Sequence, residues 1–208
     1  MSLTATDTTT YTPAPAGNHV AICYGVVDLG TQKNTFDDAK GPKPKVRLLW
    51  ELHGELKDDG TLFTIGASYT NSLNEKASLR KMLESWRGVA FTAEELKGFH
   101  LGKIVGKSCM ISIVHEPKKT GGGMRDTIKG IATMPKGIPV PKQVNPTLQF
   151  DLDSYSDSVF EALPEYLQKW ILESPEGALA RMRTSKGTPS GMQAQDPDGV
   201  AGGDEIPF

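Results

Sequence analysis

Runs of apolar residues that alternate with polar ones predict a chain built mainly of strands. Residues 19–30 (HVAICYGVVDLG) are rich in Val and Ile and end at Gly30, which is typical of a strand. In residues 45–54 (KVRLLWELHG), one face is apolar, whereas Arg47, Glu51 and His53 make the other face the wetter one. The apolar face consists of Val46, Leu48, Trp50 and Leu52. Together the patterns predict five strands, at residues 19–30, 45–54, 61–70, 106–117 and 125–134.

The period becomes helical after the third strand. Apolar residues recur at helical spacing in residues 71–88, with Asn71 or Ser72 available as an N-terminal cap and Gly88 as the stop. A short turn of helix is expected within residues 91–99, and residues 156–174 indicate two more helical pieces separated at Pro164. One helix therefore lies between the third and fourth strands, and others follow the last strand.

This order of elements suggests a fold class. Three strands, a helix and two strands is the order of the OB-fold, a five-stranded Greek-key barrel whose face and long loops commonly bind oligonucleotides or sugars. SH3-like and other small barrels differ from it by a single element, so the order leaves them open. We predict a mainly β chain with an OB-fold barrel, a helix between strands three and four, a C-terminal helical extension and a disordered tail.

Length and composition favour a single core with tails. A chain of 208 residues accommodates one domain of about 130 to 150 residues, and its 22 glycines and 14 prolines are in excess at loops and ends. Both ends are rich in Thr, Ala, Pro, Gly and Ser without periodicity, as in disordered segments. The expected parts are a disordered arm at 1–17, an OB-fold domain at 18–150, an acidic helical extension at 151–184 and a disordered tail with an acidic tip at 185–208.

The net charge of −2 hides a segregation of charge along the chain. Residues 97–147 carry a net charge of +7, whereas residues 151–176 carry −6 and the last thirteen residues contain four acids and no base. A basic middle favours contact with a polyanion, and an acidic end favours competition for the same surface. Charges spread over a solvated surface remain the alternative.

Binding of a phosphate backbone requires Lys and Arg, and binding of bases without sequence preference requires aromatic rings. The basic candidates are Lys43, Lys45, Arg47, Lys107, Lys118, Lys119, Arg125 and Lys129. The aromatic candidates are Tyr24, Phe36, Trp50, Phe63, Tyr69 and His115. Phe36 lies in a polar loop and is the better candidate for stacking, whereas Trp50 shares its strand face with aliphatic residues, which favours the core.

Signatures of catalysis, cofactors and metals are absent from the sequence. The four histidines form no i, i+4 pair, and there is no Gly-x-Ser-x-Gly motif and no complete phosphate-binding loop. Cys23 and Cys109 lie far apart in apolar runs, which indicates buried reduced thiols. No segment has the apolar length of a membrane span, and residues 1–17 lack the features of a signal peptide. We expect an intracellular, non-enzymatic protein without cofactor, metal or membrane contact.

The chain ends in GGDEIPF, an unusual sequence because a bare aromatic at a flexible end buries nothing by itself. This end resembles the DDIPF-type tip of bacterial single-stranded DNA-binding proteins, in which a glycine-rich linker ends in acids followed by Ile-Pro-Phe. The resemblance implies a tip that docks on replication and repair partners, with the terminal Phe and its carboxylate in an apolar pocket rimmed by basic residues. The matching positions are Asp204, Glu205, Ile206, Pro207 and Phe208.

The body of the chain differs from that bacterial family. The segments YTNSLNEKASLRKMLESWRG and GKSCMISIVHE, with the MPKG that follows the last strand, make residues 19–140 similar to a bacteriophage single-stranded DNA-binding protein. The resemblance implies a cytoplasmic protein of a bacterial host that coats single-stranded DNA in phage replication, recombination or repair. It does not carry over the tetrameric assembly of the bacterial family.

The sequence therefore predicts a non-catalytic protein that binds single-stranded DNA without sequence preference and recruits replication or recombination proteins through its tip. Two alternatives remain open. A strand-annealing recombination mediator would share the ligand, and a protein-interaction adaptor would bind no nucleic acid. The oligomeric state does not follow from the sequence.

Overall fold

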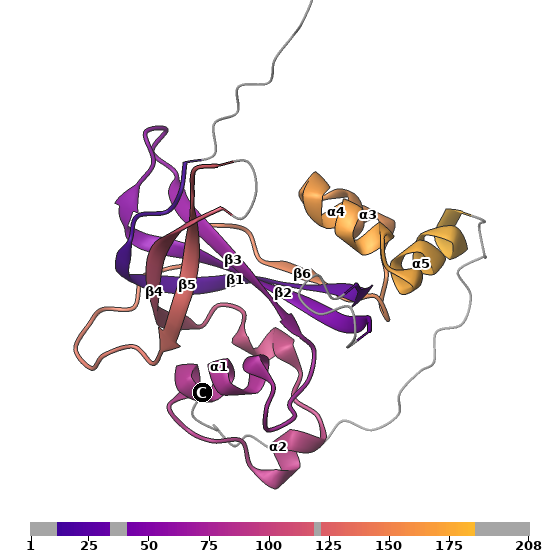
Figure 1. Cartoon of the computed structure of the whole chain (residues 1–208), viewed down its shortest axis with the longest axis horizontal. Coiled ribbons are helices and arrows are strands. Elements are labelled where there is room, and N and C mark those ends of the chain that lie inside the picture. Colours follow the sequence, from indigo (N-terminus) through magenta and orange to yellow (C-terminus); the bar gives the residue numbers. More distant parts are fainter. Residues whose placement is uncertain (1–11, 34–40, 119–121, 186–208) are drawn as a thin grey trace, which may run out of the picture.

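The computed structural model describes residues 12–33, 41–118 and 122–185 (Figure 1). Six strands form one sheet: β1 (Gly17–Gln32), β2 (Lys43–Leu56), β3 (Leu62–Thr70), β4 (Ser108–Pro117), β5 (Met124–Ala132) and β6 (Leu148–Phe150). The helices are α1 (Ser78–Arg87), α2 (Ala93–Lys97), the 3-10 turn η2 (Leu101–Ile104), α3 (Asp157–Glu161), α4 (Glu165–Leu172) and α5 (Pro175–Ser185). The predictions of a mainly β chain and of a helix between the third and fourth strands are confirmed.

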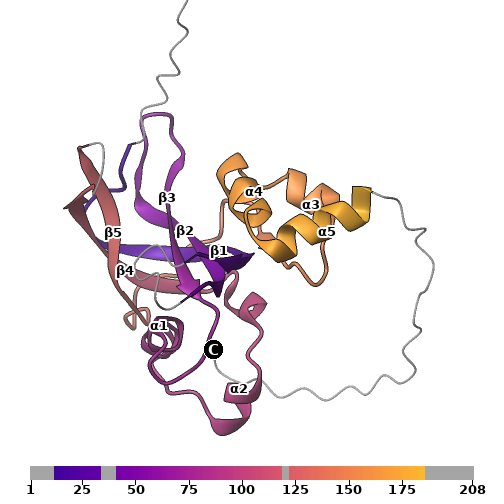
Figure 2. The ribbon, with the colours of Figure 1, turned by 45° about the vertical axis from the view of Figure 1, so that its right-hand side comes forward.

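The sheet has the order β3-β2-β1-β4-β5, and β6 pairs with β1. Neighbours along this order are antiparallel, and only β6 runs parallel to its partner. The long strand β1 pairs with β2 along most of its length and with β4 only from Gly17 to Ile22, and its register shifts after Cys23 and after Asp28. Such bulges bend a strand. Accordingly, β4 and β5 cross steeply relative to β1 and β2 (Figures 1 and 2).

One hydrophobic core lies between the sheet and α1. Trp50 of β2 is completely buried there, and its ring centroid is 6.0 Å from that of Trp86 on α1. The indole of Trp86 donates a hydrogen bond of 2.8 Å to the carbonyl of Ser108. Cys23 and Cys109 also lie in this core, and burial raises the pKa of the Cys23 thiol to about 12, so it stays protonated at neutral pH.

A second core lies on the opposite face of β1 and β2, under helices α3 and α4. Leu49 of β2 packs there and is only 4% exposed, and Glu51 on the same face is also buried. This face of β2 is still the wetter one, as predicted, because Arg47 and His53 are partly exposed whereas the other face is buried; the burial of Leu49 and Glu51 was not predicted. The buried members of this core are Val27, Leu29, Leu49, Phe150, Phe160, Leu163, Leu167 and Ile171.

Helices α3, α4 and α5 form a helical unit that is hydrogen-bonded to the end of β1. Glu176 of α5 accepts hydrogen bonds from the amide and the hydroxyl of Thr31, at 2.9 and 2.6 Å. Gly30 has a φ of 65°, and a Cβ there would lie 2.4 Å from the hydroxyl oxygen of Ser174, so only glycine permits this approach. The side chain of Gln32 donates to the carbonyl of Trp170 at 2.8 Å. These contacts fix α4 relative to the sheet.

Glu51 connects β2 to the segment that leads into β6. Its carboxylate accepts hydrogen bonds from the amides of Val144 and Asn145, at 2.8 and 2.6 Å, from the Asn145 side chain at 2.8 Å, and contacts His53 at 2.9 Å. Burial by itself raises the pKa of Glu51, but these hydrogen bonds outweigh it and lower the pKa overall. A buried carboxylate with four partners is a strong structural anchor.

Several boundaries differ from the predicted ones. Helix α1 begins at Ser78 rather than near Asn71, because Ser72 and Asn74 instead use their side chains to close turns with later amides. The short strand β6 and the helix α5 were not predicted as separate elements. Ala14 lies in the segment that was expected to be a disordered arm, but it is buried and its amide donates a hydrogen bond to Asp126 at 3.1 Å. The end of this segment therefore packs against the folded domain.

The burial of Trp50 predicts a stability effect. Trp50→Ala is expected to lower the free energy of unfolding by about 3 to 5 kcal/mol, because a large ring leaves a cavity beside Trp86. The Trp50 Nε1 lacks a hydrogen-bond partner in the described structure, so Trp50→Phe gives a smaller loss. Denaturant unfolding of both variants measures this, and equal stability of wild type and Trp50→Ala would contradict the packing.

The lowered pKa of Glu51 predicts a pH dependence. A carboxylate whose folded pKa lies below its unfolded value stabilises the fold above the unfolded pKa of about 4.5, and this contribution disappears as the pH falls through the folded pKa. The stability difference between wild type and Glu51→Gln should therefore be constant near pH 7 and shrink below about pH 4.5. Thermal melts at several pH values measure it, and a pH-independent difference would refute the role of the carboxylate.

Candidate functional site

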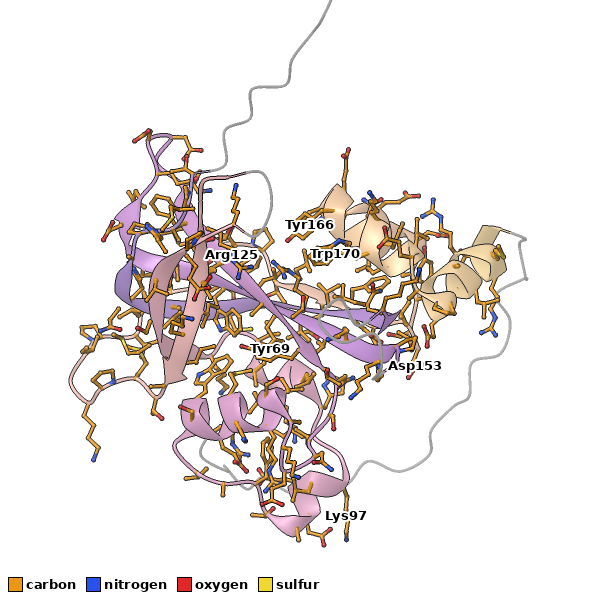
Figure 3. The ribbon with its side chains drawn as sticks, in the orientation of Figure 1. Tyr69, Lys97, Arg125, Asp153, Tyr166 and Trp170 are labelled. Atoms are coloured by element: carbon orange, nitrogen blue, oxygen red, sulfur yellow. The ribbon has the colours of Figure 1, made fainter. Side chains whose placement is uncertain are left out.

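A groove of about 700 Å³ crosses the edge strand β3, between α4 on one side and β5 on the other. Figure 3 shows Tyr166 and Trp170 of α4 and Arg125 of β5 around this region, with Tyr69 of β3 below them. The groove is lined by Tyr24, Arg47, Leu49, Thr64, Ile65, Gly66, Ala67, Tyr69, Arg125, Asp126, Thr127, Ile128 and Tyr166.

Arg47 occupies the side of the groove next to α4. Its guanidinium carbon lies 5.8 Å from the ring centroid of Tyr166 and 5.2 Å from that of Trp170, and Nη1 donates to the hydroxyl of Ser68 at 3.1 Å. A Cβ on Gly66 would come within 2.9 Å of Arg47 Nη2, so the glycine makes room for the guanidinium beside β3. No carboxylate of the described residues lies within ion-pair distance of Arg47.

Two of the groove tyrosines are neutral at physiological pH. Burial raises the pKa of Tyr24 to about 12, with a further increase from Tyr166 nearby. Burial likewise raises the pKa of Tyr69 to about 12. Neutral phenol rings beside arginines present flat surfaces and hydroxyl groups without negative charge, so they do not repel an anionic ligand.

The β5 side of the groove carries a small charge network. Arg125 lies 3.4 Å from Glu116 of β4, and Lys129 also pairs with Glu116. The Glu116 carboxylate thus pairs with both Lys129 and Arg125, which lowers the pKa of Glu116, and Asp126 of β5 adds a second carboxylate to the groove lining. Pairs this exposed are weak, so a ligand phosphate can replace the carboxylate at little cost.

Three predicted cations follow one another on β2. Lys43, Lys45 and Arg47 are alternate residues of this strand, and alternate side chains share a face, so the two lysines continue the cationic row from the groove toward the start of β2. Lys118 lies at the far end of β4, where the β4–β5 connection begins. Lys107 precedes the other end of β4 and lines no part of the groove. Of the predicted cations that the structure describes, Arg47 and Arg125 line the groove, whereas Lys43, Lys45, Lys107, Lys118 and Lys129 do not.

Two predicted aromatic contacts have structural roles. Trp50 is completely buried, so its ring has no face that a base can reach, which corrects its place among the binding candidates and agrees with the core assignment that the sequence favoured. His115 is bonded through Nε2 to the carbonyl of Ala14 at 2.8 Å and holds the N-terminal segment against β4. Neither residue lines the groove.

Some predicted residues lie outside the described part of the chain. These are Phe36, Lys119 and the tip residues Asp204, Glu205, Ile206, Pro207 and Phe208. Their predicted roles remain predictions.

The sequence-based candidates omitted the aromatic pair on α4. Tyr166 and Trp170 are four residues apart, which places both on one face of a helix. Their rings meet edge to face, with centroids 5.5 Å apart. The spacing is visible in the sequence, but only the packing of α4 over β2 shows that this face of the helix reaches Arg47.

A smaller cavity of about 260 Å³ lies on another part of the surface, beside η2 and β6. It is lined in part by Asp28, Asp151 and Asp153, and burial together with Asp151 raises the pKa of Asp28. Within residues 12–33, 41–118 and 122–185, no three His, Cys, Asp or Glu side chains cluster as metal ligands do. In the same part of the chain, no helix has the length and hydrophobicity needed to span a membrane.

Comparison with known proteins gives no family. No family model matches the chain, and no curated protein sequence matches it.

Proposed function

We propose that this protein binds single-stranded DNA without sequence preference in the groove over β3, and that it does so without catalysis. The observation that carries the proposal is the composition of the groove, which combines Arg47 and Arg125 with Tyr24, Tyr69 and Tyr166. Cations that follow the backbone and rings on which bases stack are the two components of single-strand binding without base readout.

The proposed fold is the OB-fold, whose ligand surface is the face of its second and third strands and the loops between strands one and two and four and five. The floor of the groove includes Arg47 and Leu49 of β2 and Thr64 and Gly66 of β3. The two corresponding connections contain Phe36 and Lys119, which the sequence had proposed as contacts. The position of the groove on β2 and β3 supports the assignment.

The proposal includes a second function for the chain end. Residues 204–208 would recruit replication or recombination proteins, as the resemblance of DEIPF to bacterial tips implies. A titration of the protein with poly-dT and with duplex DNA, followed by tryptophan fluorescence, tests strand binding. Trp170 adjoins Arg47 whereas Trp50 and Trp86 are buried, so Trp170→Phe is expected to remove the signal change. Equal affinity for both DNA forms would contradict the proposal.

Binding is expected to be strongly salt-dependent. If about four to six cations meet phosphates, log K falls against log salt with a slope of roughly −3 to −4, at about 0.7 per phosphate. The double variant Arg47→Ala/Arg125→Ala should weaken binding to all sequences alike and reduce the steepness by roughly 1.4, the value for two contacts.

The matched control removes two cations elsewhere. Lys81 lies on α1 and Lys97 on α2, and neither lines the groove, so Lys81→Ala/Lys97→Ala should retain the wild-type slope. Figure 3 shows Lys97 far from Arg125 and Tyr166. Titrations at four or more salt concentrations give the slopes. A slope near zero for the wild type, or equal slopes for both double variants, would contradict the groove as the site of phosphate contact.

Strand binding and partner binding should be separable. Removal of residues 199–208 is expected to leave DNA affinity equal or slightly higher, because a tethered acidic segment no longer competes for basic surface. The same truncation should abolish capture of replication proteins from a bacterial lysate, and Phe208→Ala should lose most of it, since a buried aromatic anchor dominates such contacts.

A synthetic peptide of the last ten residues supplies the control for this capture. It should compete with the intact protein, whereas the same peptide with alanine in place of the terminal phenylalanine should not. Recovery of the same proteins by intact and truncated chains would instead locate partner binding in the folded body, as the adaptor alternative requires. Acceleration of pairing between complementary strands would favour the annealing alternative.

A further inference from the structure

Helix α4 places one exposed aromatic side chain, Tyr166, at the groove, and the other lining residues belong to strands of the sheet. Tyr166 is 44% exposed, although it lines the groove and lies close to Arg47. Its neighbour Trp170 is half-buried and supports it edge to face. An exposed ring that is held from behind is available to a ligand on its open side.

The packing of α4 fixes the position of the Tyr166 ring. The residues that follow Tyr166 and Trp170, Leu167 and Ile171, are completely buried in the second core. The carbonyl of Trp170 accepts a hydrogen bond from Gln32 of β1 at 2.8 Å. Because packing already fixes α4, binding at Tyr166 requires little ordering of the protein, and pre-ordered contacts contribute more to affinity.

Arg47 is held beside this ring with its charge unneutralised. The aromatic pair lies on one side of it and Ser68 on the other, and its Nε is buried without a hydrogen-bond partner in the described structure. A guanidinium with no carboxylate partner is suited to a phosphate. Tyr166 and Arg47 therefore place a stacking surface and an anion site next to each other, which matches the alternation of base and phosphate along a strand.

We infer that α4 is a part of the strand-binding groove, with Tyr166 stacking on one base while Arg47, positioned by Trp170 and Ser68, contacts an adjacent phosphate. This inference rests on the proposed function and adds to it a contact from the helical extension. Tyr166 then contacts a base and Arg47 contacts the backbone. Removal of the bases from the strand should therefore affect the contribution of Tyr166, whereas a change in salt concentration should affect that of Arg47.

The test compares a thymidine oligonucleotide with an abasic strand of equal length. Tyr166→Ala should weaken binding to the thymidine strand by roughly 5- to 150-fold, the range for loss of one stacked base. The same variant should bind the abasic strand like the wild type and should keep the wild-type salt slope. Arg47→Met should weaken binding to both strands and reduce the steepness of the salt dependence by about 0.7.

Matched variants separate stacking from a loss of structure. Tyr166→Phe keeps the ring and should bind like the wild type, whereas Tyr166→Leu keeps apolar bulk without a ring and should behave like Tyr166→Ala. Leu179→Ala alters another exposed residue of the helical unit, which is 54% exposed on α5, and should change nothing. Thermal melts of each variant verify that the fold is retained.

The outcomes are distinguishable. If the wild type binds neither strand, the proposed function itself fails. If the wild type binds thymidine and Tyr166→Ala or Tyr166→Leu binds equally well, α4 is not part of the groove. An equal loss on thymidine and abasic strands would also overturn the inference, because Tyr166 would then act on the backbone and not on a base.

Discussion

The arrangement depends on the burial of both faces of β2. Trp50 and its alternate neighbours pack against α1 on one side, while Leu49 belongs to the core under α3 and α4 on the other. This second core, and not the first, places α4 beside β3 and so gives the groove one of its two walls. Glu51 fastens the connection to the same face through the amides of Val144 and Asn145. Without the covering helices, Arg47 would project from an open sheet and its two aromatic neighbours would lie elsewhere.

Electrostatics and shape together define the groove. The acidic residues of the helical unit do not cancel the cations of the sheet, because α4 presents aromatic side chains toward Arg47 while Glu176 is occupied by Thr31. On the opposite wall Glu116 holds Arg125 and Lys129 in position without neutralising both. Arg47 and Arg125, which have no carboxylate partner or a weak one among the described residues, are the cations that line the same groove as the tyrosines.

Much of the sheet followed from local pattern, whereas the helical wall did not. The strand that contains Trp50 and the helix that ends at Gly88 were predictable because period and stop signals are local. Arg47 was predicted as a contact from its charge alone. The burial of Leu49 on the wetter face of β2 was not predicted, since the helices that bury it lie more than 100 residues later in the chain. Tyr166 was missed for the same reason: a helix shows which residues share its face, but only tertiary packing shows what that face meets.

The central claim is that a single strand lies across β3 between α4 and β5. Ultraviolet cross-linking of a bound thymidine oligonucleotide, with the attached residues identified by mass spectrometry of the digested protein, tests it most directly. The account predicts cross-links in peptides that contain Tyr24, Tyr69 or Tyr166, and their loss at high salt. Cross-links confined to α1 and α2, on the other side of the sheet, would contradict it.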